Sequence, residues 1–298
     1  MFQRPSRPDI STNLIIIGAG VTGLTMSKLL STTELDFWLL GSPFESQLAK
    51  AGVLQNTSLA KGTVGLKFIE SEFEKLKDSI NHKSSSVKEI QVEGDGFRVR
   101  TKFQDFTCDS IIIATGKKQK ALGFEGEDEY FRKGISDCTV CDYPLYRDRP
   151  VAVVGNHPYT VRAAQLMRKH SNQVSLLWYQ KSSAPTVEGI DVYNNVSNLV
   201  ASGDDVLHTI TFTSDQGEDE LNVNALFVEG EPEPNLSFTI EPELQTDPQG
   251  HILIDENFRT NLDHIYAVGD ITGQTASYEG AKHHAEQLLK QLLQELTP

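Results

Sequence analysis

The chain is short of cysteines, basic residues and long apolar runs, and each shortage excludes a class of protein. Three cysteines in 298 residues are too few, and odd in number, for a structural disulfide framework. Lys and Arg number 27 against 41 Asp and Glu, and the net charge of -14 argues against nucleic acid or an anionic membrane as the main partner. The longest apolar runs, 14–17 and 111–114, are far too short to cross a bilayer.

Residues 1–13 contain no apolar stretch of the kind that a secretory signal requires. With so few cysteines, we therefore expect a cytoplasmic protein in a reducing compartment. The length and the ordinary composition, 38% apolar and 23% charged, predict a globular protein of about two domains.

The first part of the chain follows a strand–glycine–helix pattern. Residues 13–17 predict a buried strand, residues 18–23 read G-x-G-x-x-G, residues 24–30 continue as a helix, and residues 36–40 predict a second strand. This order is typical of a β-α-β unit that binds a dinucleotide.

The glycines of this turn have separate roles in such a unit. Gly18, Gly20 and Gly23 allow a tight turn, close approach of a pyrophosphate, and close packing of helix on strand. Val21 and Thr22 begin the helix, where free N–H groups favour phosphate. The second strand ends without an Asp or Glu for a ribose hydroxyl, so we expect Ser42 or a backbone group in that role.

The remaining pattern predicts an internal duplication. A helix is expected at 66–80, strands of a small antiparallel sheet at 87–92, 96–101 and 105–108, and a buried strand at 111–116. The order then repeats, with strands or helices expected at 150–155, 159–170, 173–179, 206–213, 219–221 and 225–230. The tail predicts strands at 250–255 and 265–270 and a helix at 279–296.

This order predicts an α/β protein with two Rossmann-like, three-layer nucleotide-binding domains, the second inserted into the first. We expect the first domain at 1–117 and 247–298, and the second at 118–246. The strand at 265–270 ends in Gly269 and Asp270, whose carboxylate either binds a sugar-like chain or caps the next turn. With the other motifs present, the ligand interpretation is favoured.

Cys138 and Cys141 form a C-x-x-C motif between the two strand–glycine–helix units. Such a pair can form a reversible disulfide with a lowered thiol pKa. The alternatives are half of a zinc site or two buried thiols, but Cys108 is isolated and the adjacent His283 and His284 are not spaced as metal ligands. We therefore expect redox chemistry and no metal.

Taken together, these motifs resemble the low-molecular-weight thioredoxin reductase family over nearly the whole chain. The matching segments are GAGVTG at 18–23, TCDSIIIATG at 107–116, GISDCTVCD at 134–142, GHI at 250–252, DENFRT at 255–260 and IYAVGD at 265–270. The resemblance implies a homodimer that binds FAD on the first domain. It places these residues near the cofactor: Ala114, Thr115, Gly116, Gly269, Asp270, Thr275, Ala276 and Ser277. It also implies that Cys141 meets the flavin, that Cys138 attacks a partner disulfide and that Asp142 donates a proton.

The second glycine turn departs from the family pattern. The family's glycine-rich NADPH turn is replaced by a run that keeps one glycine, namely Gly155, Asn156, His157, Pro158, Tyr159 and Thr160. The family's His-Arg-Arg run is replaced by Trp178, Tyr179 and Gln180, so no guanidinium remains for a 2′-phosphate. We therefore do not expect NADPH to bind.

This departure resembles the pyridine-nucleotide-independent branch of the family, which includes ferredoxin-linked and diflavin-linked enzymes. The aromatic residues of the second site suit either a second FAD, its phosphates on backbone N–H groups between His157 and Thr160, or an empty pocket. The expected partner is a thioredoxin-like or small-molecule dithiol or disulfide, with ferredoxin as an alternative donor. The rival functions are an NADPH- or ferredoxin-dependent thioredoxin reductase and a non-catalytic flavin redox sensor.

Overall fold

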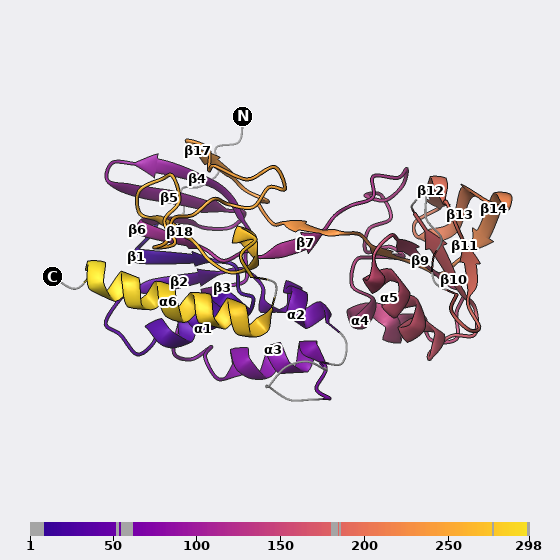
Figure 1. Cartoon of the computed structure of the whole chain (residues 1–298), viewed down its shortest axis with the longest axis horizontal. Helices are drawn as coiled ribbons and strands as arrows, with labels where there is room; N and C mark the ends of the chain where they lie inside the picture. The colour runs from indigo at the N-terminus through magenta and orange to yellow at the C-terminus, as the bar shows by residue number, and fades with distance from the viewer. Residues whose placement is uncertain are drawn as a thin grey trace. The chain divides into compact units, whose positions relative to one another are not determined.

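The structure is a computed structural model that describes residues 9–51, 54, 62–179, 184, 186–275 and 277–296. The chain divides into two compact units, which are considered separately (Figure 1). Unit 1 comprises Met1–Lys118 and Glu233–Pro298, and unit 2 is Gln119–Pro232. The prediction of two α/β units, the second inserted into the first, is confirmed. The division at 232/233 falls earlier in the chain than the expected return at 246/247.

Unit 1 is built on one mixed sheet with the strand order β17-β4-β5-β6-β1-β2-β3, and β18 also pairs with β6. Its strands are β1 (Ile10–Ile17), β2 (Phe37–Leu40), β3 (Asn81–Lys83), β4 (Val87–Glu93), β5 (Gly96–Thr101), β6 (Asp105–Ile113), β17 (Thr239–Glu241) and β18 (Ile265–Ala267). Its helical segments are α1 (Val21–Leu30), η1 (Pro43–Glu45), α2 (Gln47–Lys50), α3 (Gly65–Glu74), η3 (Asp270–Thr272) and α6 (Tyr278–Leu296).

β6 is the strand on which this sheet is centred. One edge pairs in parallel with β1 along the strand. The other edge changes partner, because residues 105–108 pair antiparallel with β5 and residues 111–113 pair in parallel with β18. The segments predicted as separate strands at 105–108 and 111–116 are therefore one strand that ends at Ile113. The predicted small antiparallel sheet is part of the main sheet.

The core of unit 1 lies on both faces of this sheet, because successive strand residues face opposite sides. Leu14 and Ile16 belong to the apolar cluster shared with α1, α3 and α6. Ile15 and Ile17 belong to the cluster shared with β4 and β5. Figure 1 shows α1, α3 and α6 together on one side of the sheet.

Unit 2 repeats the same plan. A parallel sheet of order β11-β10-β9-β15-β8 lies between α5 and an antiparallel sheet of order β12-β13-β14 (Figure 1). Its strands are β8 (Ile135–Ser136), β9 (Val151–Gly155), β10 (Val174–Trp178), β11 (Asp191–Tyr193), β12 (Ser197–Gly203), β13 (Leu207–Ser214), β14 (Gly217–Asn222) and β15 (Ala225–Glu229). Its helical segments are α4 (Thr139–Asp142), η2 (Tyr143–Tyr146) and α5 (Pro158–Arg168). The connecting segments form a pair of short strands, β7 (Lys117–Gln119) and β16 (Pro232–Pro234).

Two further predictions need correction. The helix expected at 66–80 ends at Glu74 and continues as turns. The strand expected at 250–255 is not formed, although Ile252 makes an isolated bridge with Thr246 and its N–H donates to the Ile271 carbonyl. Gly250, with φ of +86°, ends a turn there. Within the described ranges, no helix is long and apolar enough to cross a membrane.

We expect Phe106→Ala to destabilise unit 1 strongly. Phe106 is fully buried in β6 and its ring lies 5.3 Å from that of Trp38. Truncating a buried Phe to Ala costs about 3–5 kcal/mol. Phe103→Ala is the matched control, because that ring is 51% exposed. Urea unfolding followed by circular dichroism should show a lower midpoint for Phe106→Ala alone, and equal shifts for both variants would contradict the described core.

Candidate active site

The first glycine turn is tightly packed against the end of β6. Gly18 has φ of +109°, and a Cβ added there would lie 2.4 Å from the Ala114 carbonyl oxygen. A Cβ at Gly23 would lie 1.8 Å from the Gly18 carbonyl oxygen. Packing therefore requires glycine at both positions, whatever the turn binds.

Gly20 differs from these two glycines because no neighbour crowds it. The nearest atom to an added Cβ is the Ser46 Cβ at 3.5 Å. Gly20 is the N-cap of α1 and no side chain caps the helix. The first N–H groups of α1 therefore have no side-chain acceptor, and such a helix end attracts a phosphate.

The Gly269-Asp270 motif lies against this turn. A Cβ at Gly269 would lie 2.4 Å from the Thr22 Oγ1, and Gly269 itself has φ of +85°. The Val268 N–H donates to the Ile113 carbonyl, which places the motif at the end of β6. The ends of β1, β6 and β18 thus bring residues from three distant segments together.

Two buried polar atoms at these strand ends have no hydrogen-bond partner among the described residues. They are the Thr115 Oγ1 and the Asp270 Oδ1. Burial raises the pKa of Asp270, and the charge of Lys117 opposes that rise. Unpaired buried polar groups are costly, so both atoms fit the hydroxyl-rich chain of a dinucleotide such as FAD, which supplies two-electron redox chemistry when bound.

The other residues predicted near the cofactor have mixed surroundings. Ser42 precedes η1 and makes no capping bond with its side chain. The Gly116 carbonyl accepts from the Asn235 N–H. The Ser277 Oγ accepts from the Gly280 N–H in the first turn of α6, at 3.0 Å, and the Thr275 Oγ1 accepts from the Ser277 N–H. Ala276 lies outside the described residues.

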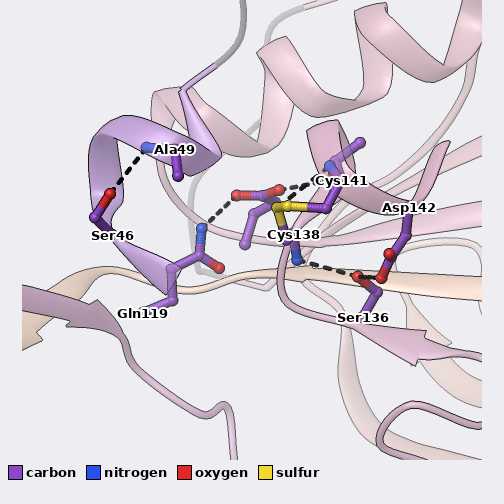
Figure 2. The surroundings of a disulfide bond; sticks show 9 residues. Ser46, Ala49, Gln119, Ser136, Cys138, Cys141 and Asp142 are labelled. Carbon is purple, nitrogen blue, oxygen red and sulfur yellow. Dashed lines mark hydrogen bonds between the residues drawn. A yellow bond between two sulfur atoms is a disulfide. The ribbon is translucent and has the colours of Figure 1, made fainter. Parts of the chain in front are cut away.

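The redox motif forms a disulfide in unit 2. Cys138 and Cys141 are bonded, with their Cα atoms 5.3 Å apart (Figure 2). Cys138 follows β8 and is the N-cap of α4, where its Sγ accepts from the Cys141 N–H at 3.3 Å. The third cysteine, Cys108, is buried in β6, and burial with the nearby Asp109 charge raises the pKa of its thiol to about 12.

A serine that the sequence did not single out connects Asp142 to this turn. The Ser136 Oγ donates to the Asp142 Oδ2 at 2.7 Å and accepts from the Cys138 N–H at 3.0 Å (Figure 2). The Asp142 carboxylate is therefore held beside the disulfide. The only sequence signal for Ser136 is its place just before the motif.

A buried carboxylate, Glu229, was also missed. Its Oε1 accepts from the Thr139 Oγ1 at 2.6 Å and its Oε2 accepts from the Gln119 Nε2 at 2.7 Å. Thr139 lies inside the C-x-x-C motif, so a second acidic group adjoins the redox turn. A glutamate at the end of the apolar run 225–228 was the available signal.

In the second glycine turn, the N–H groups expected to hold phosphates make hydrogen bonds within the turn. The Tyr159 N–H donates to the His157 Nδ1, and the Thr160 N–H donates to the His157 carbonyl. The His157 N–H donates to the Thr160 Oγ1, and Pro158 has no N–H. These groups form a capping box that satisfies the start of α5 internally. Gly155 is required by packing, because a Cβ there would lie 2.2 Å from the Glu229 carbonyl oxygen.

The aromatic residues predicted beside this turn have different surroundings. Trp178 is buried at the end of β10, and Tyr179 packs against the apolar cluster under β12–β14. His157 and Tyr159 contact each other, with ring centroids 4.6 Å apart. Asn156 belongs to the bend between β9 and α5.

The two-unit fold, the dinucleotide-type turn and the C-x-x-C disulfide define a flavin-dependent disulfide oxidoreductase. A family model described as pyridine nucleotide-disulphide oxidoreductase matches residues 12–286. The chain belongs to this family.

Named relatives agree with this placement. Thioredoxin reductase of Yarrowia lipolytica is 27% identical over 288 residues, covering 87% of this chain and 89% of the relative. Among solved structures, Lactococcus lactis thioredoxin reductase matches with a TM-score of 0.79 at 23% identity, covering 95% and 99% of the two chains. A ferredoxin-flavin thioredoxin reductase from Clostridium acetobutylicum matches with a TM-score of 0.54 at 24% identity, covering 98% and 100%. These structural likenesses show the shared fold.

We expect Asp270→Ala to weaken the retention of FAD. The change removes a buried acceptor, and hydrogen bonds to charged groups contribute about 1.5–3 kcal/mol, so the dissociation constant should rise roughly ten- to a hundredfold. Asp263→Ala, at an exposed position of the same unit, is the control. Flavin fluorescence in the filtrate after ultrafiltration measures the loss. Equal retention by Asp270→Ala and wild type would show that the carboxylate does not contact the cofactor.

Proposed function

We propose that the enzyme moves an electron pair between FAD in unit 1, the Cys138–Cys141 pair in unit 2, and a dithiol or disulfide partner. The observation that carries this proposal is the disulfide itself, formed in a turn to which Ser136 ties the Asp142 carboxylate. Relatives from Yarrowia lipolytica and Listeria monocytogenes bear the name thioredoxin reductase, which supports a thioredoxin-like partner.

The chemistry of the pair is a two-electron exchange. Reduction breaks the sulfur–sulfur bond, and two electrons and two protons give two thiols. One thiolate then attacks the partner's disulfide sulfur, and the second thiol resolves the mixed disulfide, which restores the Cys138–Cys141 bond and releases the partner dithiol. Following the family resemblance, we assign the flavin contact to Cys141, the partner contact to Cys138 and the proton transfer to Asp142.

We further propose that NADPH is not the electron donor. The N–H groups at the start of α5 are occupied by the His157 cap, and residue 158 is a proline. No Arg or Lys occupies positions 178–180 after β10. The same cap disfavours a second FAD, so we expect a single FAD per chain. The donor is then a redox protein or a dithiol, and the ferredoxin-flavin relative supports testing ferredoxin first.

The redox role of the cysteine pair predicts how many electrons each variant accepts. Anaerobic titration with dithionite should deliver about four electrons per wild-type chain, two for the flavin and two for the disulfide. Cys141→Ser and Cys138→Ser should each accept about two. Cys108→Ala, which changes a buried cysteine outside the motif, should still accept about four. A motif variant that accepts four electrons would overturn the assignment.

The proposed independence of NADPH predicts slow flavin reduction by that nucleotide. Each missing arginine removes about 1.5–3 kcal/mol, so two losses weaken binding by about three orders of magnitude. Micromolar NADPH under anaerobic conditions should leave the flavin absorbance unchanged. Dithionite, the positive control, should bleach the flavin. Reduced ferredoxin is then tested as the alternative donor. Rapid bleaching by NADPH would contradict the proposal. Two flavins per chain after saturation with FAD would instead support a second FAD.

A further inference from the structure

Glu229 places a carboxylate where the surrounding strand is apolar. It is the last residue of β15, every residue of which is buried, and Glu229 itself is only 6% exposed. Burying a carboxylate is costly unless hydrogen bonds hold it. Packing alone would be served by an apolar side chain, as at the four preceding positions of the strand. The glutamate therefore suggests a chemical role.

Hydrogen bonds fix this carboxylate in one place. Thr139 and Gln119 each donate to one of its oxygens, at 2.6 and 2.7 Å, and hydrogen bonds donated to a carboxylate favour its charged form. The Glu229 carbonyl also accepts from the Thr160 Oγ1 at 3.2 Å. Both the side chain and the backbone of Glu229 are thus held by neighbouring elements of unit 2.

Thr139 connects Glu229 to the redox pair. It follows Cys138 directly, it is buried, and it belongs to the turn that the Cys138 Sγ caps. A hydrogen bond from its hydroxyl therefore holds the Glu229 charge against the C-x-x-C turn. When the disulfide is reduced, any thiolate in this turn carries a charge of the same sign as that carboxylate.

Other titratable groups of unit 2 lie on the turn itself and on the elements beside it. The turn carries Asp137 and Asp142, and η2 and the segment after it carry Tyr143, Tyr146, Arg147, Asp148 and Arg149. α5, which packs against α4, carries Tyr159, Arg162 and Arg168, with His157 as its N-cap. Among the carboxylates, Asp142 is bonded to Ser136. Glu229 accepts from Thr139, which lies between the two cysteines.

We propose that Glu229 is a positioning residue that holds the redox turn through Thr139 and keeps protons on the two cysteines after reduction. A nearby like charge disfavours the thiolate. A less stable thiolate form makes the reduced pair a stronger reductant, because a pair whose reduced form is stabilised becomes an oxidant. This inference rests on the proposed redox role of the pair.

The first test measures the reactivity of the reduced holoenzyme with iodoacetamide as a function of pH, with mass spectrometry to count alkylation at Cys138 and Cys141. Glu229→Gln keeps the shape and an acceptor for Thr139 but removes the charge. The midpoint of its profile should fall by about one pH unit, which gives about tenfold more thiolate at pH 7. Glu127→Gln is the matched control, because Glu127 is also buried in unit 2 but accepts from the Leu122 and Gly123 N–H groups. Its profile should match wild type.

Two further measurements keep the test decisive. In exchange with glutathione, where two glutathione thiols reduce the protein disulfide and form one glutathione disulfide, Glu229→Gln should raise the equilibrium constant for reduction several-fold at pH 8. Thr139→Val removes the hydroxyl that stabilises the carboxylate charge, so its profile should shift in the same direction by a smaller amount. The pH profile of Thr139→Val tests the proposal if Glu229→Gln does not fold.

Profiles of Glu229→Gln or Thr139→Val that superimpose on wild type would overturn the proposal. These measurements do not require electron transfer from the flavin or reaction with the partner. Shifted profiles in a protein whose dithionite titration shows no electrons reaching the disulfide would reject the proposed function alone. Unshifted profiles in a protein that accepts four electrons would reject this inference alone.

Discussion

The close packing of the first glycine turn against the end of β6 is the constraint on which the cofactor site depends. Glycine at position 18 lets the turn approach the Ala114 carbonyl, and glycine at 269 lets the tail approach Thr22. These two approaches bring the ends of β1, β6 and β18 together and leave Asp270 and Thr115 with unpaired polar atoms. The unit therefore retains an uncompensated cost that a bound dinucleotide relieves, and ligand binding should add to its stability.

The two units share one fold plan but differ in whether the N-terminus of the helix after the glycine turn can bind an anion. Each has a buried strand, a glycine turn and a helix beginning at the sheet's edge. In unit 1 the start of α1 has no capping side chain, so its N–H groups are available to an anion. In unit 2 His157 and Thr160 satisfy the start of α5, and Pro158 contributes no donor. Function therefore follows from the residues at the helix start, since the fold is shared.

Sequence patterns located the main elements of both glycine turns. β1 and β9 follow from apolar runs that lead into a glycine, and α1 and α5 follow the turns. The patterns failed where a distant partner decides the structure. β6 is continuous because β5 and β18 share one of its edges, and β12 forms although its exposed polar residues give a weak strand signal. The cysteine motif was readable from spacing, whereas Ser136 and Glu229 act through hydrogen bonds that only the folded chain reveals.

The burial of Cys108 limits incorrect disulfide pairing in this enzyme. Three cysteines permit three different pairings, and an enzyme that handles disulfides continually is exposed to scrambling among them. Cys108 lies inside β6 with a thiol pKa of about 12, so it supplies almost no thiolate to attack a mixed disulfide. Burial of Cys108 therefore favours re-formation of the Cys138–Cys141 bond over pairings that involve Cys108.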